Sequence, residues 1–265
     1  IADDRVSQIH SFDYRNPKQL DDGAVLIVGA GSSGSQIADE LLRAGRKVYL
    51  SIGPHERPPR SYRGKDFVWW LGTLGKWQMQ TPPIGKEHVT IAVSGAYGGK
   101  TVDFRKFAHR GMKLLGMTKT YTNGVITIAD DLAKNIANGD ISYLGLLAEA
   151  DEYIKLNNLD FPAEEDAKLI MPDPACLTSP IRQLNLADAG IKTVLWATGY
   201  IQDFSWLKAD VFDDKKKPIH KQGVANIDGI YFIGLPWLSM RGSSFIWGVW
   251  EDARYLAVHI AKCRS

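Results

Sequence analysis

The fold of this chain is decided by VLIVGAGSSG at positions 25–34, where an apolar run meets a glycine-rich turn. The next segment has apolar residues at 37, 38, 41 and 42, which form one helical stripe, and Gly45 is a suitable C-cap. Residues 47–50 then predict a second strand. Strand, GxGxxG turn, helix and strand in this order predict a dinucleotide-binding βαβ unit. The alternative is a glycine turn with a structural role only.

The glycine loop carries the predicted phosphate site. Gly29 permits the tight turn, Gly31 lets the backbone approach a pyrophosphate, and Gly34 lets helix and strand pack closely. Backbone N–H groups around Ser32 and Ser33, together with the helix dipole, would attract the phosphates.

The end of the second strand bears on the choice of nucleotide. An NAD-binding unit usually carries Asp or Glu there, and this chain has Ser51. Arg57, Arg60 and Arg63 follow at every third position, and guanidinium groups match phosphate well. We therefore expect Ser51 and these arginines to face the 2′-phosphate of NADPH, in preference to NADH. Alternatively, two of the three arginines are solvated surface residues.

Composition excludes several other classes of protein. The chain of 265 residues has 32 basic and 30 acidic side chains, so its net charge gives no basis for binding nucleic acid or a membrane surface. Cys176 and Cys263 lack metal-ligand or disulfide-framework spacing, which favours a reducing, cytoplasmic location. No HExxH, carboxylate pair or GxSxG motif predicts a metal or a hydrolytic site. The first residues contain neither an initiator Met nor a signal peptide, so we expect a chain cut from something longer.

The remaining elements are predicted from periodicity and turn residues. We expect irregular structure over much of 72–99, strands around the Asn123-Gly124 turn, and buried strands at 192–197 and 229–233. Helical patterns occupy 104–115, 130–136, 144–156 and 244–261.

Three motifs together resemble one family of flavoproteins. His10, Tyr14 and Arg15 form HxxxYR, the glycine loop follows, and Ala197-Thr198-Gly199-Tyr200 ends a buried strand. This order resembles the flavin-dependent monooxygenases of the flavin-containing and Baeyer–Villiger type, and related flavin oxidoreductases. The family signature places Phe and Gly ahead of the His, where this chain has Asp4 and Val6.

The resemblance implies an α/β fold that combines a Rossmann-like NADPH-binding domain with the C-terminal part of a split FAD-binding domain. It places a linker or returning segment at 1–23, the NADPH domain at 24–190 and the FAD part at 191–265. The resemblance also places several residues of this last segment near a cofactor. They are Ala197, Thr198, Gly199, Pro236, Ser243, Ser244 and Phe245. The first glycine loop of the family has no counterpart here, so a partner chain or a missing N-terminal segment should complete the FAD domain and pair with the strand at 231–233.

The resemblance also implies an activity. NADPH would reduce FAD, and the reduced flavin would use O2 to oxygenate a small organic substrate; no catalytic residue is identified. Two alternatives stay open, a flavin-dependent NAD(P)H oxidoreductase without oxygenation and a nucleotide-binding fragment with no activity of its own.

Overall fold

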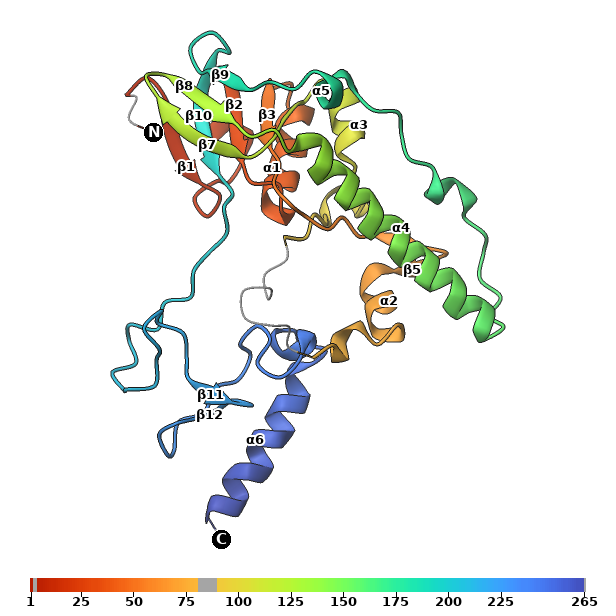
Figure 1. The fold of residues 1–265 in the computed structure, drawn as a ribbon, viewed down its shortest axis with the longest axis vertical. Helices are drawn as coiled ribbons and strands as arrows, with labels where there is room; N and C mark the ends of the chain where they lie inside the picture. The colour runs from red at the N-terminus through yellow and green to blue at the C-terminus, as the bar shows by residue number, and fades with distance from the viewer. Residues whose placement is uncertain (2–3, 81–89, 265) are drawn as a thin grey trace. The chain divides into compact units, whose positions relative to one another are not determined.

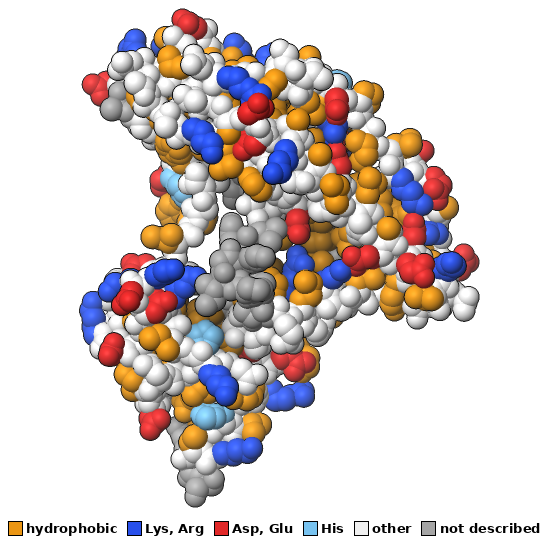
Figure 2. Space-filling model, in the orientation of Figure 1, with side chains coloured by type: hydrophobic (Ala, Val, Ile, Leu, Met, Phe, Trp, Pro, Cys, Tyr) orange, Lys and Arg blue, Asp and Glu red, His pale blue; other side chains and the backbone are white. Residues whose placement is uncertain are grey.

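A computed structural model describes residues 1, 4–80 and 90–264. Its contacts divide the chain into two compact units, Ile1–Phe67 with Val89–Gly199 and Val68–His88 with Tyr200–Ser265. On the face shown in Figure 2, basic and acidic side chains are interspersed in both units, in keeping with their nearly equal numbers. Among the described residues, no helix has both the length and the apolar character to cross a bilayer.

The first unit is built on a parallel sheet of five strands in the order β1-β10-β2-β3-β6 (Figure 1). The strands are β1 (Ser7–His10), β2 (Ala24–Val28), β3 (Val48–Ser51), β6 (Lys113–Leu115) and β10 (Ile191–Trp196). β2 is central, and its side chains are buried on both faces because each face is covered by another layer. This is the Rossmann-like α/β sheet that the glycine motif predicts.

Alternate residues of the strands enter two separate cores. Val25, Ile27, Val48 and Leu50 pack with α1 (Ser32–Arg43), α3 (Phe104–His109) and the start of α4 (Leu132–Leu156). Ala24, Leu26 and Tyr49 pack on the other face with an antiparallel sheet of β7 (Thr118–Thr122), β8 (Val125–Ile128) and β9 (Gln183–Asn185). The unit therefore has three layers, with helices on one side of the parallel sheet and strands on the other.

Short elements complete the first unit. They are the hairpin of β4 (Ser61–Tyr62) and β5 (Lys65–Asp66), α5 (Ala175–Thr178), and the 3-10 turns η1 (Pro17–Gln19), η3 (Ala96–Gly98) and η4 (Glu165–Lys168).

The second unit contains less regular structure. It holds most of α2 (Phe67–Thr73), η2 (Lys76–Gln78), η5 (Arg241–Ser244), α6 (Val249–Arg264) and a hairpin of β11 (His220–Lys221) and β12 (Val224–Ala225). One cluster of its buried residues consists of Val211, Phe232 and Leu238.

The compact units of the structure do not coincide with the predicted domain boundaries. The segment 1–23 supplies β1, which pairs in parallel with β10, so Ile9 lies opposite Leu195. β10 in turn pairs with β2, so residues 191–199 belong to the unit of the glycine loop. Both predicted boundaries, after 23 and before 191, thus fall inside the first unit. Pairing across more than 180 positions leaves no trace in local periodicity.

Five predicted elements also differ. The helical pattern at 104–115 is α3 followed by β6, and the patterns at 130–136 and 144–156 belong to the single helix α4. The last helix begins at Val249, later than predicted. At 229–233 there is no strand: Tyr231 makes one isolated bridge to Val224 of β12, and the pairing does not extend into a ladder. In the predicted irregular range 72–99, residues 81–89 lie outside the described residues.

Candidate dinucleotide-binding site

The glycine loop is packed too closely for side chains at two of its glycines. A Cβ at Gly34 would lie 1.9 Å from the carbonyl oxygen of Gly29. Gly29 has a φ of +105°, and a Cβ there would lie 2.4 Å from the carbonyl oxygen of Ala197. The turn therefore brings together β2, α1 and the end of β10, as the motif predicts for Gly29 and Gly34.

The N-terminus of α1 is open to an anion. Gly31 is the N-cap residue, no side chain caps the helix, and its first turn contains no acidic residue. A 12-residue helix with uncapped N–H groups carries a partial positive charge at this end. Close backbone approach and an uncapped helix together fit the pyrophosphate of a dinucleotide.

A short segment at 90–92 covers one side of the loop. The Ser32 hydroxyl donates to the carbonyl oxygen of Ile91 at 3.0 Å, and the Thr90 methyl lies 3.3 Å from where a Gly31 Cβ would be. Glu56 holds this segment through two backbone hydrogen bonds of 2.8 Å, one to Thr90 and one from Ala92. Sequence reasoning missed this cover because it lies about 60 positions from the loop.

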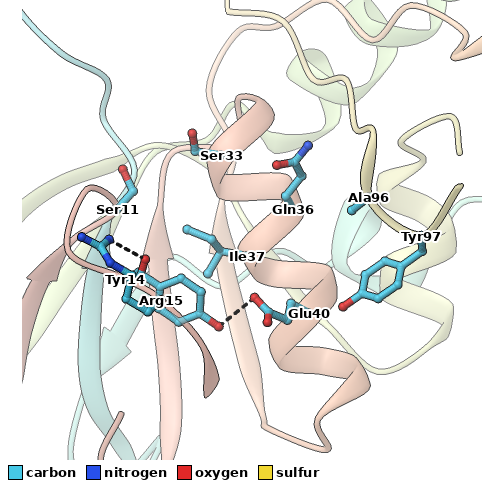
Figure 3. Close-up of a pocket in the computed structure, with 9 residues that line it drawn as sticks. All are labelled: Ser11, Tyr14, Arg15, Ser33, Gln36, Ile37, Glu40, Ala96 and Tyr97. Atoms are coloured by element: carbon cyan, nitrogen blue, oxygen red, sulfur yellow. Dashed lines mark hydrogen bonds between the residues drawn. The ribbon is translucent and has the colours of Figure 1, made fainter. Parts of the chain in front are cut away.

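A cavity of about 400 Å³ opens beside α1 (Figure 3). Its lining combines the HxxxYR segment, one face of α1 and the turn at 96–97: Ser11, Tyr14, Arg15, Ser33, Gln36, Ile37, Glu40, Ala96 and Tyr97. The Tyr14 hydroxyl donates to Glu40 Oε2 at 3.0 Å, and burial together with this hydrogen bond raises the pKa of Tyr14. The motif residues Tyr14 and Arg15 thus lie next to Ser33 of the glycine loop.

His10 joins the ends of two neighbouring strands. The Phe12 N–H donates to His10 Nδ1 at 3.2 Å, so that nitrogen is the acceptor. The ring proton then lies on Nε2, which donates to the Gly199 carbonyl at 3.3 Å. His10 therefore anchors the exit of β10, where the first unit ends.

The residues predicted to face a 2′-phosphate have other partners. The Ser51 hydroxyl is buried, donates to Gly116 O at 2.9 Å and accepts from the Thr118 N–H at 3.0 Å. Arg57 is buried and pairs with Asp140 at 2.7 Å. Arg60 and Arg63 pair with Asp66 and Asp151 at 2.6 and 2.8 Å. Ser51 and Arg57 thus have protein partners in this structure, and their assignment to a phosphate stays a prediction.

The residues expected near a flavin are split between the units. Ala197 packs against the glycine loop, and Thr198 and Gly199 follow it at the end of the first unit. In the second unit the Ser243 hydroxyl is fully buried and accepts from the N–H groups of Ser239 and Met240 at 3.1 Å, so it stabilises its own turn. Ser244 and Pro236 are exposed, and the Phe245 ring lies 4.9 Å from that of Trp77.

Asp140 is the buried residue that sequence reasoning missed. Its carboxylate accepts from Arg57 and, at 2.6 Å, from Arg105, and all three side chains are nearly inaccessible. The signal was present, since Asp140 interrupts the apolar face of α4 between Ile136 and Tyr143. A carboxylate on a buried helix face requires a cationic partner. Among the described residues, no group of three or more His, Cys, Asp or Glu could hold a metal ion.

His55 makes the stability of the first unit depend on pH. The ring is buried, its Nδ1 contacts Gly53 O at 2.9 Å, and its Nε2 has no hydrogen-bond partner. Burial lowers the pKa of His55. Below about pH 6.5, His55 therefore binds a proton more readily in the unfolded chain than in the folded chain. The free energy of unfolding should fall as the pH drops below this value.

We expect His55→Phe to remove this dependence. Urea unfolding between pH 7.5 and 5 measures how the free energy of unfolding depends on pH. His55 should contribute a slope that approaches but does not exceed about 1.4 kcal/mol per pH unit, so the slope should be smaller in the variant. Burial also lowers the pKa of His220, which lies in the second unit. His220→Phe is therefore the matched control, and it should leave the slope for the first unit unchanged. An unchanged slope in His55→Phe would contradict the prediction.

Comparisons with known proteins agree with this geometry. A model of the "Flavin-binding monooxygenase-like" family matches residues 3–153. A relative from Geobacillus kaustophilus, "Uncharacterized oxidoreductase CzcO-like", is 31% identical over 96% of this chain and 57% of its own length. "Flavin-containing monooxygenase 5" of Cavia porcellus is 26% identical over 78% of this chain and 33% of its own. The chain therefore spans little more than half the length of the first of these relatives.

The fold is shared with a solved structure. A variant flavin monooxygenase from Stenotrophomonas maltophilia superposes with a TM-score of 0.53, covering 98% of this chain and 56% of that protein at 13% identity. The region matched by the family model contains the glycine loop, α1 and the HxxxYR segment described above. The chain belongs to the flavin-binding monooxygenase-like family of oxidoreductases.

Proposed function

We propose that this chain is the dinucleotide-binding part of an FAD-dependent monooxygenase that uses NADPH as reductant and O2 to oxygenate a small organic substrate. The observation that carries the proposal is the glycine cradle, in which Gly29 and Gly34 meet Ala197 at the uncapped start of α1. Such a cradle is suited to a pyrophosphate, and the matched family is "Flavin-binding monooxygenase-like".

The chain's own residues would bind and orient the dinucleotide. The N–H groups at the start of α1 would hold the pyrophosphate, and the segment 90–92 would limit access of water to one side of the loop. The cavity beside Ser33, Tyr14 and Arg15 would take the part of the ligand that extends along α1. When bound, FAD would supply the transfer of electrons from the nicotinamide to O2.

The described residues do not form an FAD site by themselves. They contain one glycine loop of this kind, and the Ser243 hydroxyl accepts a hydrogen bond from within its own turn. The second unit also exposes large apolar side chains, with Ile201 94%, Trp206 72% and Ile246 96% accessible. Where such side chains form a contiguous patch, they mark an interaction site. We propose that another chain or a further segment covers it and completes the FAD domain.

The test uses the protein purified with whatever segment or chain accompanies it. Oxidised flavin is yellow, and the proposal expects its visible absorption band to bleach on anaerobic addition of NADPH and to return with O2. Product analysis by mass spectrometry then separates the candidates, because a monooxygenase transfers one atom of isotopically labelled O2 to its substrate. Bleaching with dye reduction but no transfer of label would indicate an oxidoreductase without oxygenation. A colourless preparation that binds NADP⁺ would indicate a nucleotide-binding unit without activity.

A further inference from the structure

The loop that follows β3 runs along α4 for most of its length. Four contacts occur in the same order on both segments: Ile52 with Asn135, His55 with Gly139, Arg57 with Asp140, and Arg63 with Asp151. Asn135 and Asp151 are 16 positions apart on one helix, which corresponds to about 24 Å at 1.5 Å per residue. Arg63 therefore lies far from the end of β3, where the adenosine ribose of a dinucleotide binds in this fold.

The arginines of this loop are compensated by carboxylates. Arg57 shares Asp140 with Arg105, which also pairs with Asp173 at 2.7 Å. Arg63 shares Asp151 with Lys168. Binding a 2′-phosphate through Arg57 would require breaking an ion pair that is buried, and binding it through Arg63 would require breaking one that is half-buried.

The contacts that the described residues make at the end of β3 include no cation. The Ser51 hydroxyl bonds to Gly116 and Thr118, and Gly53 faces Met117, whose Cγ lies 3.4 Å from where a Gly53 Cβ would be. The Met117 N–H donates to Asp131 Oδ1 at 3.0 Å, so the nearest charged partner along these contacts is a carboxylate. These described contacts offer a 2′-phosphate neither a guanidinium nor an ammonium group.

We propose that this site does not discriminate by the 2′-phosphate, so that NADH and NADPH bind with comparable affinity, and that Gly53 is the position that sets this specificity. The inference rests on the proposed function, because it concerns the same dinucleotide site. Discrimination in favour of a phosphate requires a cation at the strand end. Glycine at position 53 provides no side chain there, and the arginines that follow are held by carboxylates.

Binding of the oxidised dinucleotides tests this without any turnover. Isothermal titration of the full chain with NADP⁺ and with NAD⁺ should give dissociation constants within about threefold of each other. NADP⁺ binding more than tenfold tighter would overturn the inference and leave the proposed function standing. Binding of neither dinucleotide would overturn both, so the two failures are distinguishable.

Substitution at Gly53 tests the assigned position. Gly53 does not have a positive φ, and a Cβ added to it would make only ordinary contact with a flexible Met, so a side chain fits. Gly53→Arg should raise the preference for NADP⁺ at least tenfold, whereas Gly53→Gln, which is neutral, should leave the ratio unchanged. An unchanged ratio in Gly53→Arg would overturn the assignment.

Two further variants locate any phosphate contact elsewhere. Arg63→Gln should not change the ratio, since Arg63 is anchored at the far part of α4. Lys119 follows Thr118 and is exposed, and Lys119→Gln should also leave the ratio unchanged. A preference for NADP⁺ that either variant abolishes would assign the phosphate to that residue and contradict the inference.

Discussion

Asp140→Ala is expected to lower the free energy of unfolding of the first unit by about 3–5 kcal/mol. The carboxylate of Asp140 bonds to Arg57 at 2.7 Å and to Arg105 at 2.6 Å, and the two guanidinium-bearing side chains are 6% and 9% exposed. Removing it leaves Arg57 without its carboxylate and Arg105 with Asp173 alone, in a region that water hardly reaches. The penalty of an unpaired buried charge exceeds the loss of the ion pair itself.

Asp39→Ala is the matched control for Asp140→Ala. Asp39 also joins two arginines, Arg43 and Arg110, but these are 42% and 35% exposed. Water can therefore solvate them after the substitution, and we expect a loss of about 1 kcal/mol or less. Urea unfolding followed by circular dichroism measures both variants. Equal losses in the two would show that burial does not decide the effect.

Gly34→Ala is expected to weaken dinucleotide binding at least tenfold and to destabilise the first unit by about 1–3 kcal/mol. The added methyl would lie 1.9 Å from Gly29 O, a backbone atom that cannot move without shifting β2 against α1. Such a shift displaces the N–H groups that would contact the pyrophosphate. Titration with NADP⁺ and urea unfolding measure the two effects.

Gly145→Ala separates a local clash from a general effect of adding a methyl group. Gly145 lies in α4 and has no atom within 4 Å of the position of a Cβ. Alanine should therefore stabilise the helix by about 0.5–1 kcal/mol and leave nucleotide binding unchanged. Retention of normal binding in Gly34→Ala would contradict the role assigned to the close approach.

Local patterns were sufficient for the dinucleotide unit. β2, α1 and β3 fall where the apolar run, the helical stripe and the second strand predicted them, because each is encoded within about a dozen neighbouring residues. The same holds for the turn at Asn123-Gly124 between β7 and β8. Periodicity did not separate α3 from β6, because each element has too few residues to show a period.

The site was predicted only in part. The glycines could be placed by motif, because their role depends on backbone geometry within one turn. The roles of Ser51 and Arg57 could not, because each depends on a partner far along the chain: Thr118 for Ser51, and Asp140 for Arg57. A serine or an arginine near the end of a strand is equally compatible with a ligand and with such a partner.

The sequence by itself determined that the chain contains a βαβ unit with a GxGxxG turn and which flavoprotein family it resembles, because motif order and spacing are properties of the chain. Only the tertiary structure decided that β1 and β10 join the same sheet and that the arginines after β3 are bound to carboxylates of α4 and of the adjoining hairpin. The physical reason is that strand pairing and charge compensation join residues by distance in space, and local sequence does not record which distant partner lies within reach.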